Sequence, residues 1–276
     1  MIRIGCTTFS EHGSIVQRKT SKLFEYASVF PVVELDTSYH YLPKEKDVRN
    51  WLTQVPDNFR FILKVHQSVT TQGDLPQGMS MAEALAAFKQ AIQPMVSAGR
   101  LYCLLAQFPN QFKCTKENVA YLDEVRQWFA DYPVAIELRD NSWYQPEFCS
   151  SMQAYMHKQK FSLVIVDEPK KLSTTVPLMP LVTNPAFALC RFHGRNDVGW
   201  TATGPDAKKK RTLYRYNEKE LSELRQAVEK AAAKAQEVAV IFNNNAGGDA
   251  ADNALALIKA MDIDYQQLNP SQLELF

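Results

Sequence analysis

The chain has 276 residues, of which 46% are hydrophobic and 22% are charged, so it can bury a substantial core. Its 31 lysine and arginine residues nearly balance its 30 acidic residues and give a net charge of +1. This balance argues against a protein that binds nucleic acid or membranes through bulk charge. No apolar run approaches the roughly 18 residues of a membrane span, so we expect no membrane partner.

Five cysteines are scattered along the chain, and no two of them form a Cys-x-x-Cys pair. Because their number is odd and their spacing fits no common zinc or redox motif, we interpret them as reduced thiols. The N-terminal segment MIRIGCTTFS has no apolar signal-peptide core. These features predict a cytoplasmic protein.

Eight short strand-like runs recur along the chain, most of them separated by helical patterns. The runs cover residues 3–6, 32–36, 59–64, 101–107, 134–139, 161–167, 187–193 and 238–243. Helix-start signals lie between several of them: Pro146 suits a first helical turn, Asn217 with Glu220 forms a capping pair, and Asp249 is a candidate cap for the last helix.

Strands that alternate with helices over a length near the roughly 250 residues of the fold predict a TIM-type (β/α)8 barrel. Four prolines and no helical period lie between residues 167 and 187, so we expect an irregular sixth connection. The alternative is an open doubly wound sheet, but no G-x-G-x-x-G follows the first run. We predict one barrel domain over residues 1–262 and a tail over residues 263–276.

Charged residues spaced by two positions lie at or just beyond the ends of several of these runs. They are Glu34 and Asp36, Glu137 and Arg139, and Arg191, His193 and Arg195. Side chains two positions apart share one face of a strand, and barrel active sites lie at the carboxyl ends of the strands. The pattern therefore predicts one site in which these side chains meet.

Several cations at the predicted mouth favour an anionic ligand, since arginine binds phosphate and carboxylate in a bidentate manner. We predict Glu34, Glu137 and His193 as catalytic residues, the two glutamates serving as general acid and base. The predicted substrate-binding residues are Lys64, Gln107, Arg139, Trp143, Arg191, Arg195, Asn243 and Asn244. The loop 243–249 precedes the last helix, where barrels often hold a phosphate.

Metal-binding residue types are present at Glu34, His66, Glu137, Asp167 and His193. However, neither an H-x-H nor an H-E-x-x-H spacing occurs, so we predict no metal site and assign no cofactor. The segment 194–216 combines the basic run 208–211 with aromatic residues. Such a segment either binds phosphates and bases or is a solvated charged loop.

Six groups of residues carry a resemblance to a known family. They are 34–39, 59–61 with Lys64, 107–109, 137–139 with Ser142 and Trp143, 193–195, and 243–244 with Gly247 and Gly248. In this order they resemble the YecE-like family (domain of unknown function 72) over nearly the whole chain. The resemblance implies a TIM barrel and a single site, and it implies no activity. The chain departs from the family pattern at Asp36-Thr37 and at His12-Gly13.

The tail contains a further motif. Gln272-Leu273-Glu274-Leu275-Phe276 is similar to the Gln-Leu-x-Leu-Phe peptide with which bacterial replication and repair proteins dock on the DNA sliding clamp. Gln272, Leu273, Leu275 and Phe276 would be its anchors in a groove of the partner. The alternative is that the apolar residues fold back onto the barrel.

Three functions fit these features. The first is a hydrolase acting on a phosphoester or related anionic substrate, phosphorylated or derived from nucleic acid, that the tail brings to DNA. The second is a carbohydrate-active hydrolase with Glu34 and Glu137 as its carboxylate pair and Tyr39, Trp143 or Trp200 as a sugar platform. The third is a non-catalytic ligand-binding or clamp-associated adaptor. The cations at the mouth favour the first.

Overall fold

A computed structural model of the chain describes residues 1–17 and 20–270. Within these residues nine parallel strands form one sheet in the order β6-β5-β4-β3-β2-β1-β9-β8-β7. The strands are β1 Ile2–Thr7, β2 Val32–Leu35, β3 Arg60–Lys64, β4 Leu101–Phe108, β5 Val134–Leu138, β6 Ser162–Leu163, β7 Ile165–Asp167, β8 Phe187–Phe192 and β9 Glu237–Phe242.

The sixth strand position of the barrel is shared by β6 and β7, which only Val164 separates. β6 pairs with β5, and β7 pairs with β8, so the two ends of the sheet meet at Val164 and the barrel is nearly closed. Eight strand positions in a nearly closed parallel sheet confirm the predicted TIM-type barrel.

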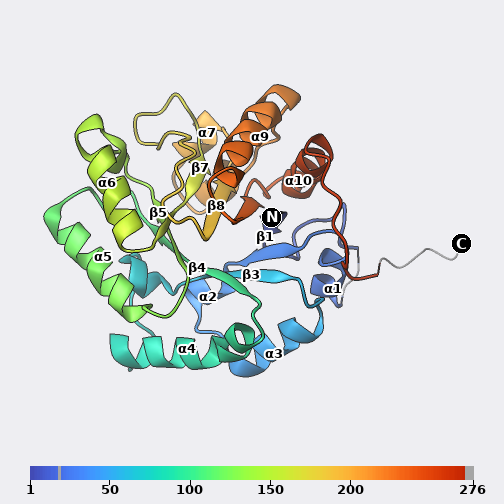
Figure 1. Cartoon of the computed structure of the whole chain (residues 1–276), viewed down its shortest axis with the longest axis horizontal. Coiled ribbons are helices and arrows are strands. Elements are labelled where there is room, and N and C mark those ends of the chain that lie inside the picture. Colours follow the sequence, from blue (N-terminus) through green and yellow to red (C-terminus); the bar gives the residue numbers. More distant parts are fainter. Residues whose placement is uncertain (18–19, 271–276) are drawn as a thin grey trace, which may run out of the picture.

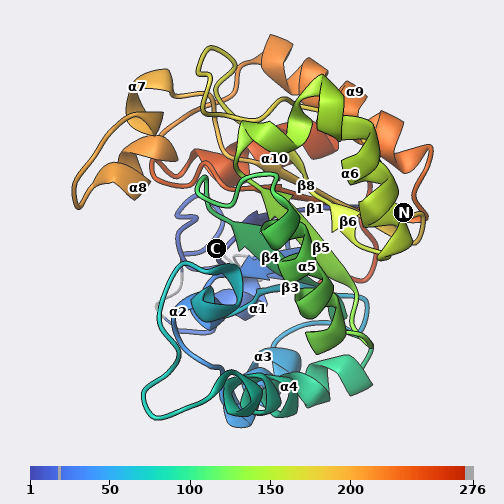
Figure 2. The same ribbon diagram turned by 90° about the vertical axis from the view of Figure 1, so that its left-hand side faces the viewer.

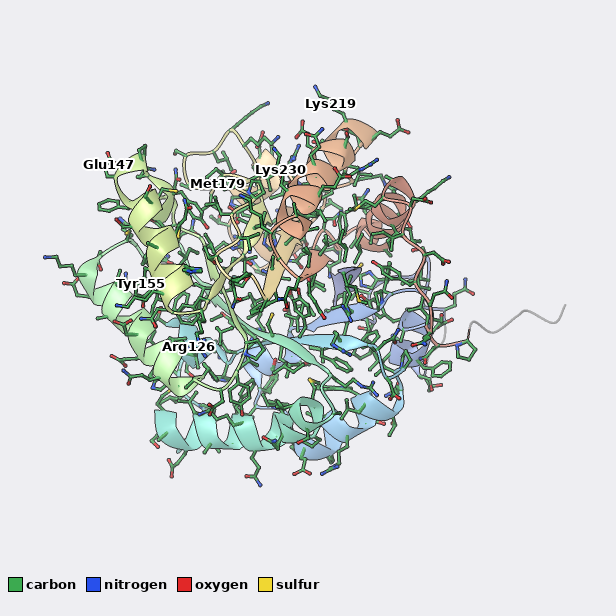
Figure 3. All side chains as sticks on the ribbon, in the orientation of Figure 1. Arg126, Glu147, Tyr155, Met179, Lys219 and Lys230 are labelled. Atoms are coloured by element: carbon green, nitrogen blue, oxygen red, sulfur yellow. The ribbon has the colours of Figure 1, made fainter. Side chains whose placement is uncertain are left out.

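Helices surround this sheet. They are α1 Lys22–Tyr26, α2 Thr37–His40, α3 Glu45–Thr53, α4 Met81–Ser97, α5 Lys116–Trp128, α6 Pro146–Lys158, α7 Asp197–Trp200, α8 Ala207–Arg211, α9 Glu218–Ala232 and α10 Asp249–Ala260, with 3-10 turns η1 Gln67–Thr70 and η2 Asn141–Tyr144. The longer helices lie around the strands (Figure 1), and α7 and α8 lie together at one side (Figure 2). The exposed side chains of Glu147 on α6 and Lys219 on α9 point outward (Figure 3).

Two of the three predicted helix starts are confirmed. Pro146 is the first residue of α6, and Asn217 forms a capping box with Glu220 at the start of α9. The prediction that Asp249 caps the last helix is wrong, because Asp249 is the first residue of α10 itself. The N-cap is Gly248, whose φ of 80° is left-handed backbone that glycine adopts without strain, and it has no side-chain capping bond.

The sixth connection is irregular, as predicted: residues 168–186 contain no helix or strand. Within it, the Thr183 hydroxyl donates to the carbonyl of Phe161 and accepts from the amide of Leu163, both at 2.8 Å. This side chain therefore satisfies one backbone group of the short β6 and one of the residue before it.

No helix in residues 1–17 and 20–270 is long and apolar enough to cross a membrane. After α10, the chain returns to the barrel. The amide of Ile4 donates to the Tyr265 hydroxyl at 2.8 Å, and the side chain of Asn269 donates to the carbonyls of Phe24 and Gln54. The domain boundary at residue 262 stays a prediction, and Gln272–Phe276 lie outside the described residues.

Candidate functional site

The centre of the site is the guanidinium of Arg191, near the end of β8 and only 1% exposed. Its Nε and Nη2 donate to the two carboxylate oxygens of Glu34 at 2.7 and 2.5 Å. Its Nη1 donates to Gln107 Oε1 at 3.1 Å and to the carboxylate of Glu137. Side chains from β2, β4, β5 and β8 thus meet at one point inside the barrel. We call these residues, together with the partners of Arg139 described next, the arginine network.

A second guanidinium, that of Arg139, extends the arginine network. Its Nε donates to Glu137 at 2.5 Å, its Nη1 lies 2.9 Å from Glu168, and its Nη2 lies 3.1 Å from His193 Nε2. One ligand-type atom from each of Glu137, Glu168 and His193 lies within 4.8 Å of the others, a grouping that could hold a metal ion. The Arg139 guanidinium contacts all three residues, so an ion there would have to displace it.

The two predicted catalytic glutamates have opposite electrostatic environments. Burial raises the pKa of Glu34 above its ordinary value, and Arg191 only partly offsets this. Burial also acts to raise the pKa of Glu137, but Arg139, Arg191 and His193 together hold that pKa well below its usual range. Paired carboxyl groups with separated pKa values are typical of acid/base sites.

His193 is a neutral imidazole in this environment. Burial, with Arg139 beside it, lowers the pKa of His193 to about 3. The Asn243 amide nitrogen lies 2.9 Å from Nδ1, and Nε2 lies 3.2 Å from Glu137 Oε1. With the amide donating to Nδ1, the ring proton is on Nε2 and faces Glu137.

A cavity of about 840 Å³ opens beside the arginine network, at the carboxyl ends of β1, β2 and β9. Two residues of its wall touch the network directly. Thr7 Oγ1 donates to Glu34 at 3.4 Å, and Asn243 contacts His193. Asp36, Lys209 and Gly248, the N-cap of α10, also line this cavity. We call it the β1–β9 cavity.

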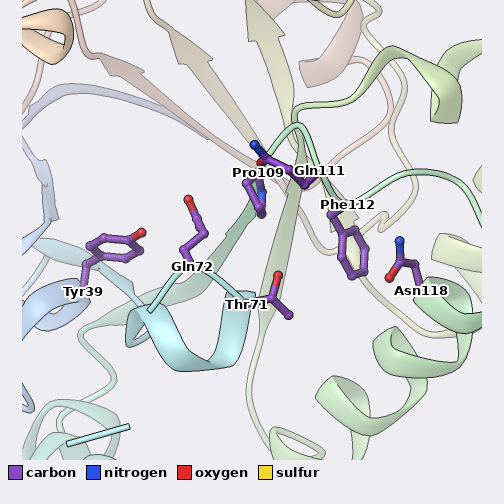
Figure 4. Close-up of a pocket in the computed structure, with 7 residues that line it drawn as sticks. All are labelled: Tyr39, Thr71, Gln72, Pro109, Gln111, Phe112 and Asn118. Carbon is purple, nitrogen blue, oxygen red and sulfur yellow. The ribbon is translucent and has the colours of Figure 1, made fainter. Parts of the chain in front are cut away.

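A second cavity, of about 520 Å³, adjoins the network from the side of β3 and β4 (Figure 4). Its wall is Tyr39, Thr71, Gln72, Pro109, Gln111, Phe112 and Asn118, none of them charged. Gln72 Nε2 donates to the Gln107 carbonyl at 2.6 Å. The Lys64 ammonium lies 4.4 Å from the centre of the Tyr39 ring. We call it the amide cavity, after Gln72, Gln111 and Asn118.

The segment with α7 and α8 covers part of the arginine network. The Trp200 ring lies 5.6 Å from the Arg139 guanidinium and 5.1 Å from that of Arg211. Its centre is 6.3 Å from the His193 ring. One indole therefore packs between two cations directly over the site.

Three predicted substrate-binding residues have their described contacts elsewhere. Arg195 binds Asp167 through both carboxylate oxygens and reaches Glu223 at 2.9 Å. Asn244 is buried and donates to the Tyr214 carbonyl and to Asn253. Trp143 is buried, donates its indole N–H to the Phe112 carbonyl at 2.7 Å and stacks on that ring. These contacts give the three side chains structural roles in the strand-end loops.

The arginines predicted to bind an anionic ligand all bind carboxylates of the chain itself: Arg139, Arg191 and Arg195. Each charge is therefore at least partly compensated before any ligand arrives. Two lysines near the site differ from these arginines. Lys64 forms no ion pair with a described residue, and Lys209 lines the β1–β9 cavity.

Glu168 is a site residue that the sequence patterns did not single out. Burial raises its pKa to about 7, although Arg139 opposes the shift. Its Oε2 accepts from the Val176 amide at 3.1 Å. The sequence does place Glu168 next to Asp167 at a strand end. Adjacent side chains on a strand face opposite ways, so Asp167 faces Arg195 and Glu168 faces Arg139.

The fold and the site together define an α/β barrel with a buried arginine–glutamate network at the carboxyl ends of its strands. Residues 3–274 match the model of the family described as Protein of unknown function DUF72, and the chain belongs to that family. This confirms the YecE-like resemblance.

Named relatives agree with this assignment. Over 283 residues, covering 100% of both chains, the sequence is 38% identical to UPF0759 protein YunF of Bacillus subtilis. A solved DUF72 family structure from Enterococcus faecalis has a TM-score of 0.94 at 49% identity and covers 99% of this chain and 100% of that one. One from Thermotoga maritima has a TM-score of 0.80 at 32% identity, with coverage of 95% and 100%. The names of these relatives give a family and no reaction.

Proposed function

We propose that this protein is a hydrolase that binds a small anionic ligand, phosphorylated or derived from nucleic acid, in the β1–β9 cavity. The observation that carries the proposal is the contact between cavity and network: Thr7 and Asn243 line the cavity and touch Glu34 and His193. Ionisable groups with perturbed pKa values beside a cavity at strand ends are typical of catalytic sites.

The anion would be held on the side of the β1–β9 cavity formed by α10 and Lys209. The N-cap Gly248 lines the cavity and offers no side-chain cap, so the first amides of α10 are available to an anion. Lys209 adds a positive charge. The arginines of the network would act on the ligand only indirectly, by fixing the carboxyl groups.

The proton-transfer group would be Glu34. Its raised pKa suits a general acid/base, and the Thr7 hydroxyl connects it to the cavity. Glu137, whose pKa is held low, would remain ionised and orient Arg191 and the neutral His193. Glu34 and Glu137 thus would have different roles, as the opposite shifts of their pKa values require.

Binding is tested by titrating the full chain with inorganic phosphate in a calorimeter. Lys209→Gln should weaken binding about fivefold, corresponding to about 1 kcal/mol for one exposed charge. Lys230→Gln, an exposed lysine on α9, is the matched control and should change nothing. Equal affinities of both variants would contradict the proposed location of the anion.

Catalysis is tested with a panel of phosphomonoesters and phosphodiesters. Glu34→Gln should reduce turnover by about 10²–10⁴, the usual contribution of a general acid/base. Thr7→Val, which keeps the shape of Thr7 and removes its hydroxyl, should reduce turnover less. Full turnover of Glu34→Gln would refute its role, and ligand binding without turnover of any substrate would favour the adaptor function.

The amide cavity favours a second candidate, a carbohydrate-active hydrolase. An aromatic ring, Tyr39, with three uncharged amide side chains is a suitable lining for a neutral sugar (Figure 4). Tyr39→Ala should then abolish release of reducing sugar from oligosaccharides, whereas Tyr41→Ala, at a neighbouring tyrosine that is 77% exposed, should not. Activity on oligosaccharides but not on phosphoesters would decide for this candidate.

We also propose that Gln272, Leu273, Leu275 and Phe276 bind a bacterial DNA sliding clamp, which would place the protein in the cytoplasm. In support, Asn269 is tied to the barrel by its amide and side chain, so such a peptide would start from a fixed point. The test is capture by purified clamp on a biosensor. Deleting residues 272–276 should abolish capture, as should Gln272→Ala with Phe276→Ala, whereas Asn269→Ala should retain it. Unchanged capture after deletion would end the proposal.

A further inference from the structure

Lys64 is a buried amine at the carboxyl end of β3. Its exposed fraction is 8%, and no described residue forms an ion pair or hydrogen bond with its ammonium group. Lysines are rarely buried in this way without a carboxylate partner. The centre of the Tyr39 ring lies 4.4 Å from Nζ.

The position of Lys64 is fixed from two sides. The Ser38 hydroxyl donates to its backbone carbonyl at 2.6 Å and holds the end of the strand against α2. The Tyr39 ring lies against its ammonium and forms part of the wall of the amide cavity (Figure 4). Asp36, which interacts electrostatically with Lys64, lines the β1–β9 cavity. Lys64 therefore has one wall residue of each cavity as a neighbour.

The surroundings of Lys64 make its ammonium group easier to deprotonate than that of an exposed lysine. Burial lowers the pKa of Lys64, and the positive charge of Arg191 acts in the same direction, against the carboxylates of Asp36, Glu34 and Glu137. A neutral lysine is a nucleophile, and desolvation or a neighbouring cation is how lysines are activated for attack on carbonyl groups.

We propose that Lys64 forms an imine with the carbonyl carbon of a small aldehyde or α-keto acid that enters from one of these cavities. This activity goes beyond the proposed hydrolysis and needs neither Lys209 nor α10.

The step balances without an oxidant or reductant. The Nζ lone pair attacks the carbonyl carbon, a C–N bond forms, and the carbonyl π pair moves to oxygen. The oxygen takes up a proton to give a carbinolamine and leaves with a second proton as water, while a C=N bond forms. The two protons that water carries away are those that Nζ loses.

The test is reductive trapping on the full chain at pH 7. The protein is incubated with glyoxylate, an anionic aldehyde, or with propionaldehyde, a neutral one, in the presence of cyanoborohydride, which delivers hydride to the C=N bond. Peptide mass spectrometry then compares modification of Lys64 with that of exposed Lys230. Because a lowered pKa raises the neutral, nucleophilic fraction of an amine, we expect Lys64 to be modified faster than Lys230.

A preference for glyoxylate would identify an anionic carbonyl substrate, and a preference for propionaldehyde a neutral one; both support the proposal. Lys64 modified no faster than Lys230 with either probe would overturn it. Lys64→Arg should remove the fast site and leave modification of Lys230 unchanged. Since trapping uses no phosphate, its failure would leave the proposed anion binding and hydrolysis intact.

Discussion

Removing Arg191 should destabilise the fold strongly, because this one guanidinium binds two carboxylates that are otherwise fully buried. In Arg191→Met the apolar side chain fills much of the volume but leaves Glu34 and Glu137 without their shared partner. Breaking a buried ion pair by removing one partner costs about 3–5 kcal/mol. That is a large share of the roughly 5–15 kcal/mol that stabilises an average domain.

The stability lost in Arg191→Met should increase as the pH rises. Without Arg191, the pKa of Glu34, already raised in the wild type, rises further above its unfolded value of about 4.3, and the low pKa of Glu137 rises as well. A carboxyl group with a raised folded pKa stabilises the fold below the unfolded pKa, and this contribution is lost as the pH rises through the folded pKa. The difference between wild type and Arg191→Met should therefore be larger at pH 8 than at pH 5.

Urea denaturation followed by circular dichroism measures the free energy of unfolding of each variant. Arg49→Met is the matched control, since Arg49 is exposed and, among residues 1–17 and 20–270, pairs only with Glu45, four residues away on α3. Arg49→Met should lower the free energy of unfolding by about 0.3–0.5 kcal/mol. If Arg191→Met were no less stable than Arg49→Met, or if its loss were the same at both pH values, the central role of Arg191 would be refuted.

Three further outcomes are expected. The pKa of Glu168 is raised to about 7, so its contribution to stability is lost as the pH rises toward neutrality. Wild type should therefore lose stability relative to Glu168→Gln between pH 5 and 8. The same difference in unfolding free energy between the two proteins at both pH values would contradict this. Asn244→Ala should cost about 1–3 kcal/mol by the same measurement, since the Tyr214 carbonyl loses its side-chain donor and Asn253 Oδ1 keeps only the Tyr216 amide. A loss within error would show that the two bonds of Asn244 are dispensable. Gly5→Ala should prevent folding, because its added Cβ would lie 2.1 Å from the Val32 carbonyl oxygen. Gly13→Ala, whose Cβ meets open space, should express normally. Soluble Gly5→Ala with an unchanged circular dichroism spectrum would show that β1 and β2 can separate.

The barrel could be predicted from sequence because its periodic signals are local. Strand-like runs, a proline at the start of α6 and the capping pair at the start of α9 each lie within a few residues of the element that they specify. The start of α10 was misassigned by one residue because the left-handed backbone of Gly248 decides it, and a capping aspartate looks the same in sequence.

The side-chain alternation correctly indicated which charges point into the barrel, but not what they meet there. Whether Arg191 binds a ligand or Glu34 depends on residues 157 positions apart. Arg195 has the same parity as Arg191, yet it lies beyond the last residue of β8 and turns to Asp167. Glu168 escaped notice because its role depends on Arg139, which belongs to another strand end.

Arg139 contacts two acids and one aromatic ring. Its guanidinium forms ion pairs with Glu137 and Glu168, and the Trp200 indole packs against it. A displacement of the α7–α8 segment that withdrew the indole would admit water to these acids and move their proton affinities toward those of free side chains. Movement of the α7–α8 segment would then change the protonation of Glu137 and Glu168 at the same time. This coupling would be detectable as proton release or uptake when a molecule binds.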